Sequence, residues 1–270
     1  MVMFIEEEPL DQVVDQVEQI QVENSPHGQS TPIFLIHDGG GTTFPYHCLE
    51  SLGRSVYGIA NPHFNTGGAF DGGVPEVGRL YADMIRHAAT RPDFPVKPGP
   101  DGRVPVLLGG WSFGGMASLE VAHVLAADKA VRVMGILMVD SPYPGMTKPA
   151  NGVLARRTRK VSSKNEIMVE RCMSEARRML DRWDLPAWEQ GSRPPAVMLR
   201  ATSSVPSKGP GVDRVDVCRS ESSLGWSRYH QDMFESVLEV DGNHFDLFSF
   251  GRVADTTKVM RQGLNVLDHC

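Results

Sequence analysis

One segment, residues 104–127, constrains the fold of this chain more than any other. It begins with the continuous apolar run VPVLLGGW and passes through SFGG directly into a helical pattern over residues 114–127. A strand that is apolar at every position is covered on both faces, which is typical of a parallel sheet flanked by helices. The segment therefore predicts an α/β fold.

Other segments repeat this alternation along the chain. The strand candidates lie at residues 33–37, 56–60, 133–140, 196–201 and 236–242, and further helical patterns lie at 74–88 and 253–268. A length of 270 residues suits a single α/β domain with a sizeable core. We expect one mostly parallel sheet with helices on both faces.

The interval between the strands at 133–140 and 196–201 is too long for a simple connection, which usually takes a handful of residues. Ser163 and Glu166 form a capping-box pattern that predicts the start of a helix. Behind it, one helical stripe collects the residues Met168, Cys172, Ala176 and Met179. We interpret residues 145–193, approximately, as a helical insertion and call it the lid.

Charge is unevenly distributed over the chain. The formal net charge is −6, yet the first 23 residues alone carry seven acidic residues and no Lys or Arg. We therefore expect residues 1–30 to be an acidic N-terminal arm and linker, and residues 31–270 to form the domain. A weak apolar pattern in the arm (Leu10, Val13, Val14, Val17 and Ile20) fits a helix, and a solvated extension fits equally well. No concentrated basic face predicts nucleic-acid binding.

Targeting and cofactor signals are missing from the sequence. The start, MVMFIEEEPLDQ, has no basic region before an apolar run, and no stretch of about 18 apolar residues predicts a membrane span. The four cysteines (Cys48, Cys172, Cys218 and Cys270) lack CxxC or metal-ligand spacing. We expect reduced thiols in a cytoplasmic protein, with no metal and no cofactor.

A candidate nucleophile lies where the apolar strand meets the helix. Residues 110–114 read Gly-Trp-Ser-Phe-Gly, the G-x-S-x-G pattern in which a serine occupies a strained strand-to-helix turn. Bulky residues at the two flanking glycines would collide with the strand and the helix. Ser112 is the expected nucleophile, and the helix N-terminus behind it favours a developing oxyanion. An inert serine in a turn is the alternative.

A serine hydroxyl needs a base, and the base needs an acid to orient it. His244 follows a strand, in the loop sequence DGNHF, and is the preferred base over His230 in a polar helical stretch. Asp140 ends the strand at 133–140, at the sheet edge where catalytic residues of α/β proteins gather. We prefer it as the acid over Asp213 or Asp216, although it could instead cap the next turn.

The oxyanion of such a reaction needs two N–H donors. One is expected from Phe113, directly after the serine. The second is expected from the loop HDGGGT at residues 37–42, where glycines allow close backbone approach. Gly39 is the preferred donor and Gly40 the next; a plain glycine turn is the alternative.

Four motifs together resemble the thioesterase domains of polyketide synthases and nonribosomal peptide synthetases. They are IFLIHDGGGTT, GGWSFGG, LMVDSPYP and DGNHFDLF, and the position of Asp140 is the most specific of the matches. The resemblance covers residues 31–268 and implies an α/β-hydrolase fold with a helical lid. It also implies a free-standing fungal enzyme of secondary metabolism. Its substrate would be an acyl chain held on the phosphopantetheine of a carrier protein, released by hydrolysis or cyclisation through an acyl-serine.

The lid carries an excess of basic residues that bears on this partner. Residues 145–182 contain ten Lys or Arg and four acidic residues, and the basic cluster Arg156, Arg157, Arg159 and Lys160 is a candidate docking surface for an acidic carrier protein. A solvated helix face explains the charge as well. Two other functions stay open: a carboxylesterase acting on small oxygen esters, which would use the same residues, and a non-catalytic binding protein with a hydrolase fold.

Overall fold

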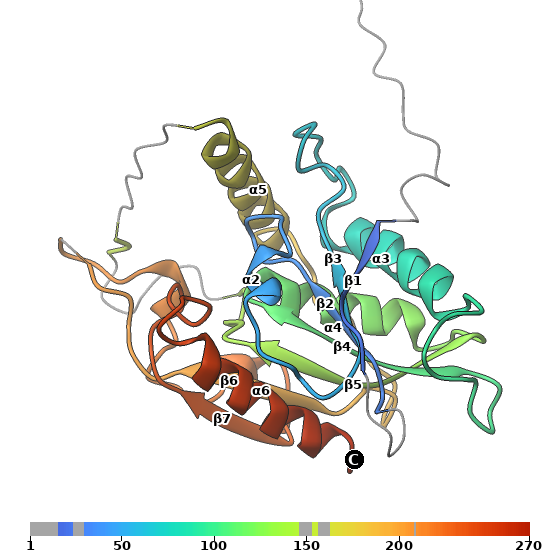
Figure 1. Cartoon of the computed structure of the whole chain (residues 1–270). Coiled ribbons are helices and arrows are strands. Elements are labelled where there is room, and N and C mark those ends of the chain that lie inside the picture. Colours follow the sequence, from blue (N-terminus) through green and yellow to red (C-terminus); the bar gives the residue numbers. More distant parts are fainter. Residues whose placement is uncertain (1–15, 24–29, 146–152, 156–162, 208) are drawn as a thin grey trace, which may run out of the picture.

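The computed structural model describes residues 16–23, 30–145, 153–155, 163–207 and 209–270. Its centre is a seven-stranded sheet in the order β1-β3-β2-β4-β5-β6-β7, parallel throughout except for β1 (Figure 1). The strands are β1 (Val17–Gln21), β2 (Ile33–Ile36), β3 (Val56–Ile59), β4 (Val104–Trp111), β5 (Val131–Val139), β6 (Ala196–Ala201) and β7 (Ser236–Val240). The predicted α/β fold with a mostly parallel sheet is confirmed.

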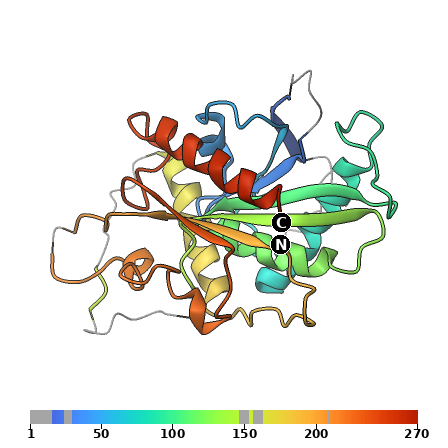
Figure 2. The same cartoon turned by 90° about the horizontal axis from the view of Figure 1, so that it is seen from below.

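Helices cover both faces of this sheet (Figure 2). On one face α3 (Gly73–Ala89) and α4 (Phe113–Leu125) pack in a core that includes Phe34 and Ile36. On the other, α6 (Val253–Leu267) and the short α2 (Phe44–His47) pack in a core that includes Ile33 and Leu35. Successive side chains of a strand point to opposite faces, so a wholly apolar strand such as β2 needs both layers.

The N-terminal segment differs from its prediction. Residues 17–21 form the edge strand β1, which pairs antiparallel with β3, Val17 lying opposite Ile59. The side chains of Val17 and Ile20 pack against the cores on opposite faces of the sheet, which a helix would not allow. The sheet therefore begins within the segment we assigned to the arm and linker. Residues 1–15 and 24–29 lie outside the described residues.

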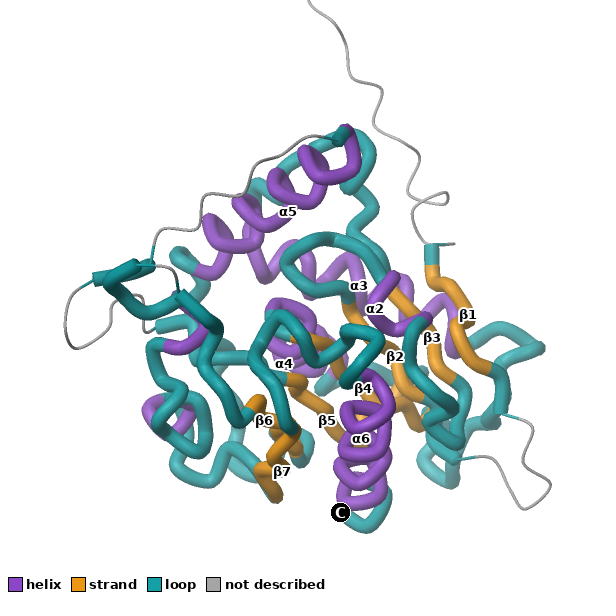
Figure 3. The backbone as a smooth tube through the Cα atoms, turned by 60° about the vertical axis from the view of Figure 1, so that its left-hand side comes forward, coloured by secondary structure: helices purple, strands orange, loops and turns teal. Residues whose placement is uncertain are grey.

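Helix α5 (Lys164–Leu180) forms the described core of the lid and rises beyond the edge of the sheet at which α2 lies (Figures 1 and 3). It begins with the predicted capping box: Ser163 Oγ accepts the Glu166 N–H at 3.2 Å, and the Glu166 carboxylate accepts the Ser163 N–H at 2.9 Å. Cys172, Ala176 and Met179 are buried, as the stripe predicts. Among the described helices, none is both long and apolar enough to cross a membrane.

Candidate active site

The turn between β4 and α4 has the geometry expected around Ser112. The residue has φ 56° and ψ −115°, a sparsely populated conformation for a non-glycine residue. A Cβ on Gly110 would lie 2.6 Å from the carbonyl oxygen of Ile36, and one on Gly114 would lie 2.2 Å from the same oxygen. Both flanking glycines therefore serve the close packing of the turn against β2. The Ser112 N–H donates to the Val139 carbonyl at 2.9 Å, so the turn lies beside the end of β5.

The start of α4 is packed against the loop that follows β2. Ser112 is the N-cap residue, and its side chain makes no capping bond. Phe113 is the first residue of α4, so its N–H is one of the helix N-terminal groups that have no partner within the helix. The Phe113 ring stacks on His37 with centroids 5.5 Å apart. Burial lowers the pKa of His37 to about 4, against the opposing bond to Asp38. The neutral ring donates from Nδ1 to the Asp38 carbonyl (2.5 Å) and accepts at Nε2 from the Tyr81 hydroxyl (2.6 Å).

The glycines of this loop have different partners. The Gly40 N–H donates to Asp38 Oδ1 at 3.0 Å, whereas the Gly39 N–H has no hydrogen-bond partner within the described part of the chain. Gly41 has φ +85°, which favours glycine. The loop therefore keeps the N–H of Gly39 free for a ligand and commits that of Gly40 to a side chain. The role of Gly39 as an oxyanion donor stays a prediction.

Helix α5 lies directly on the same loop. A Cβ on Gly39 would lie 3.0 Å from Met173 Sδ, and one on Gly41 would lie 2.9 Å from Cys172 Sγ. Beside this contact, a cavity of about 650 Å³ opens between α5 and the segment after β3. Its lining includes Asn61, His63, Cys172, Glu175 and Arg178. Cys172 thus separates residues 37–42, which we call the glycine loop, from a space large enough for part of a ligand.

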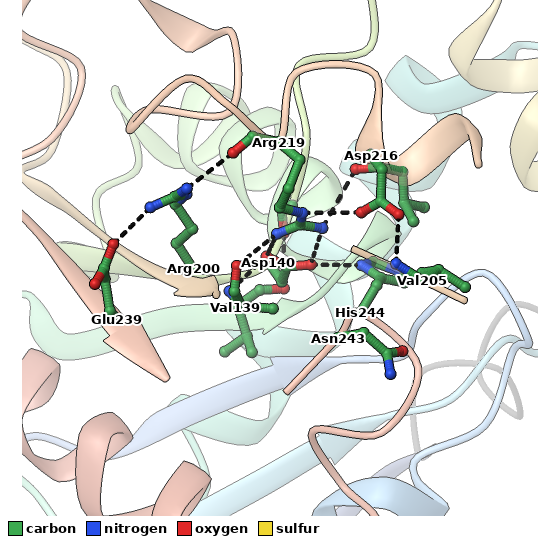
Figure 4. Close-up of polar contacts among 12 residues, drawn as sticks. Val139, Asp140, Arg200, Val205, Asp216, Arg219, Glu239, Asn243 and His244 are labelled. Atoms are coloured by element: carbon green, nitrogen blue, oxygen red, sulfur yellow. Dashed lines mark hydrogen bonds and ion pairs between the residues drawn. The ribbon is translucent and has the colours of Figure 1, made fainter. Parts of the chain in front are cut away.

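His244 and Asp140 come together at the edge of the sheet, as predicted. His244 Nδ1 lies 2.8 Å from Asp140 Oδ2 (Figure 4). An ionised carboxylate only accepts hydrogen bonds, so Nδ1 carries the proton and Nε2 is left as an acceptor. The imidazole lies against Trp111, the residue before Ser112, with ring centroids 5.5 Å apart. No hydrogen bond joins Ser112 to His244 among the described contacts; such bonds often tighten only when substrate binds.

The Asp140 carboxylate is completely buried and surrounded by donors. Besides His244, the Ala201 N–H donates to Oδ1 at 2.8 Å, and the Arg219 guanidinium donates to both oxygens. Burial alone would raise the pKa of Asp140. The hydrogen bonds and positive charge of His244 and Arg219 outweigh it and lower this pKa to about 2. The carboxylate is therefore ionised at any pH near neutrality.

The alternative residues lie elsewhere. His230 is exposed and its Nδ1 accepts the Asp232 N–H at 3.2 Å. Asp213 caps the short 3-10 helix Arg214–Asp216, and the Asp216 side chain binds Arg219 rather than a histidine. The described residues contain no group of His, Cys, Asp and Glu able to hold a metal ion. The candidate docking residues Arg156, Arg157, Arg159 and Lys160 fall outside the described residues.

Arg219 is a residue that sequence reasoning missed. It lies in a polar segment without a motif, and its partner Asp140 is 79 positions away. No local pattern distinguishes it from the many surface arginines of this chain. Its burial beside a carboxylate is visible only in the structure, where its side chain is 7% exposed.

Comparison with known proteins identifies the family of the chain. A family model described as "Thioesterase domain" matches residues 31–260. The chain belongs to the thioesterase family. Probable thioesterase BOA10 of Botryotinia fuckeliana is 37% identical over 88% of this thioesterase and 85% of its own length. Nonribosomal peptide synthetase imqB of Aspergillus flavus is 30% identical over 87% of this chain and 8% of the synthetase.

The solved structures add evidence on the fold. The crystal structure of the NocB thioesterase domain from the nocardicin cluster is similar with a TM-score of 0.64 and 24% identity, covering 93% of this thioesterase and 99% of that domain. At this identity the similarity concerns the fold alone. It confirms the predicted α/β-hydrolase architecture of this thioesterase.

Proposed function

We propose that this thioesterase releases a polyketide or peptidyl chain from the phosphopantetheine of a carrier protein through an ester on Ser112. The observation that carries the proposal is the buried His244–Asp140 pair, 2.8 Å apart, at the sheet edge beside the strained Ser112 turn. This is the arrangement that activates a serine hydroxyl for acyl transfer.

In the first half of the reaction, Ser112 Oγ attacks the thioester carbonyl while its proton passes to His244 Nε2. The imidazolium that forms is stabilised by Asp140 through Nδ1. The N–H groups of Phe113 and Gly39 stabilise the tetrahedral oxyanion. When the carbon–sulfur bond breaks, His244 returns the proton to the pantetheine thiol, and the acyl chain remains on Ser112.

The second half of the reaction releases the chain. His244 Nε2 takes a proton from water, which attacks the ester carbonyl. When the bond to Ser112 Oγ breaks, His244 returns the proton to Oγ and the chain leaves as a free acid. A hydroxyl or carbon nucleophile of the chain itself would yield a cyclised product instead. The cavity between α5 and the segment after β3 adjoins the glycine loop through Cys172. We propose that it accommodates part of the acyl chain and thereby selects the nucleophile.

Two observations support a carrier protein as the partner. The match to one region of a nonribosomal peptide synthetase associates this domain with a carrier-bound chain. The excess of basic residues over 145–182 suits an acidic partner. Reversing the charge of Arg156, Arg157 and Arg159 should raise KM for a carrier-bound acyl chain and leave KM for a small pantetheine thioester unchanged. Arg91→Glu, at an exposed arginine outside the lid, is the matched control. Equal effects on both substrates would contradict docking.

A fluorophosphonate probe followed by intact mass measurement tests the reaction itself. The protein should gain one adduct, on Ser112, and Ser112→Ala should gain none. His244→Ala incubated with acyl-pantetheine should form little acyl-serine, because His244 is the base that activates Ser112. Absence of an adduct on folded protein would favour a non-catalytic binding protein. Turnover of small oxygen esters far above that of carrier-bound thioesters would favour a carboxylesterase.

A further inference from the structure

A buried ion cluster lies beside the catalytic acid. The Arg219 guanidinium binds Asp140 with both Nη atoms, Nη2 to Oδ2 at 2.7 Å and Nη1 to Oδ1 at 2.5 Å (Figure 4). Its Nε donates to Asp216 Oδ1 at 2.9 Å. The side chains of Asp140, Asp216 and Arg219 are 0, 1 and 7% exposed. The mechanism above uses only the first of these three groups.

Backbone groups hold the cluster in place. Asp216 Oδ2 accepts the Val205 N–H at 2.6 Å, and Arg219 Nη1 also donates to the Ala201 carbonyl at 3.1 Å. The cluster therefore joins the ends of β5 and β6 to the segment before β7. A bidentate arginine fixes the plane of the carboxylate it binds. Since both Asp140 oxygens are held in this way, Oδ2 can meet His244 Nδ1 in only one orientation.

The net charge of the cluster together with His244 depends on whether His244 is protonated. With His244 neutral, the two carboxylates and one guanidinium sum to −1; with His244 protonated, the sum is zero. Arg219 alone would offset the charge of Asp140 and weaken its attraction for the imidazolium. Asp216 restores that charge. An arginine can therefore orient the acid without weakening its electrostatic support of His244.

We propose that Arg219 and Asp216 act together as positioning residues, Arg219 orienting Asp140 and Asp216 balancing its charge, so that the cluster sets the pH above which His244 serves as base. The inference rests on the proposed function of His244 as that base. It assigns a function to two residues that contact neither the substrate nor Ser112.

The other charged groups around this cluster are the same in every variant of the test. Near the imidazole they are Asp38 in the loop after β2, and Asp246 and Arg252 around its own turn; near the guanidinium they are Arg200 and Glu239. Arg200 donates to the Arg219 carbonyl at 2.8 Å and pairs with Glu239. None of them is altered in the variants below, so their contribution cancels.

The test is the acidic limb of the pH profile of kcat/KM for a soluble acyl-pantetheine thioester. Arg219→Gln leaves two uncompensated carboxylates and should move the limb to higher pH by about one unit. Asp216→Asn leaves Asp140 neutralised by Arg219 and should move the limb to lower pH by a similar amount. The double variant restores the net charge of −1 and should lie between the two single variants.

Two further variants keep the inference testable if Arg219→Gln does not fold. Arg219→Lys keeps the charge but loses the bidentate contact, so kcat should fall roughly tenfold while the limb stays in place. Arg214→Gln, at a partly exposed arginine of the same segment that pairs with Asp181, should change neither quantity. If the acidic limb of kcat/KM lies at the same pH in all variants, the cluster has only a structural role. Wild-type turnover without an adduct on Ser112 would instead overturn the proposed function.

Discussion

Two buried carboxylates of the active site come from two different loops and have opposite pKa shifts. Asp38 follows β2 and Asp140 follows β5. Burial raises the pKa of Asp38 to about 6, because the Gly40 N–H and the neighbouring His244 offset it only in part. Burial also opposes ionisation of Asp140, yet the donors around it lower its pKa to about 2. The number of donors, rather than the depth of burial, decides the direction of the shift.

The two loops are accordingly built in different ways. The loop after β2 consists of glycines that bring the backbone close to α4 and α5, and it supplies Asp38 with a single N–H from another residue. The loop after β5 gathers side chains from distant segments around Asp140. We expect added atoms in the first loop, and lost charges around the second, to have the larger effects on activity and stability.

The largest difference between the two carboxylates should appear in turnover. Asp140→Asn should lower kcat by about 10⁴-fold, because an amide no longer holds His244 in the tautomer with Nε2 free. Asp38→Asn should lower it less than about tenfold, since no described hydrogen bond joins Asp38 to Ser112 or His244. Steady-state kinetics on an acyl-pantetheine thioester compares them. Similar losses in both variants would contradict the assignment of Asp140 as the acid.

The next effect concerns an added atom at the Ser112 turn. Gly114→Ala places a Cβ 2.2 Å from the Ile36 carbonyl oxygen, a contact with backbone that cannot move aside. We expect a loss of about 3 kcal/mol in the free energy of unfolding. Gly251→Ala, at a glycine with no heavy atom within 4 Å of its ideal Cβ, is the control and should change little. Urea unfolding measures both; equal stability of the two variants would show that the turn is not tightly packed.

The sequence predicted the parts of this site that depend on local pattern. The six parallel strands and the turn at Ser112 follow from continuous apolar runs and flanking glycines. Asp140 and His244 could be paired across 104 positions because each follows a strand, and parallel strands end at one edge. The preference for Gly39 over Gly40 as an oxyanion donor stays a prediction.

Features that depend on distant partners could not be predicted in this way. The segment of β1 has mixed polarity, since only Val17 and Ile20 pack into the cores, and its pairing with β3 determines its conformation. Arg219 resembles any polar-segment arginine until Asp140 lies beside it. The low basicity of His37 and the raised pKa of Asp38 likewise follow from burial that no local pattern encodes.

The shift of Asp38 predicts how stability depends on pH. Its folded pKa of about 6 exceeds its ordinary value of 3.8, so ionisation costs folding free energy. This cost is absent below pH 3.8, grows between pH 3.8 and 6, and is complete above pH 6. Asp38→Asn removes it and still offers an oxygen to the Gly40 N–H. We expect the variant to be more stable than wild type by about 2 kcal/mol at pH 7.5 and equally stable near pH 4.

Urea unfolding at pH 4 and 7.5 measures the difference in the free energy of unfolding between Asp38→Asn and wild type. The shift of Asp140 has the opposite sign: its lowered pKa contributes stability above pH 3.8 that is lost as the pH falls toward 2. The stability gain of Asp38→Asn is therefore sought at pH 7.5, where both carboxylates are ionised in wild type. If the difference in stability between Asp38→Asn and wild type is the same at pH 4 and 7.5, the pKa of Asp38 is not raised in the folded protein.

The smallest effect is expected where the glycine loop meets the lid. Gly39→Ala places a Cβ 3.0 Å from Met173 Sδ, the far end of a flexible side chain that can move. Its free energy of unfolding should change by less than about 1 kcal/mol, and kcat/KM should fall by less than about tenfold. Met173→Ala in the same protein removes the obstacle and should restore activity, whereas Met173→Ala alone serves as the control. If the double variant stays as slow as Gly39→Ala, the added methyl group acts on the N–H donor of Gly39 itself rather than through the lid.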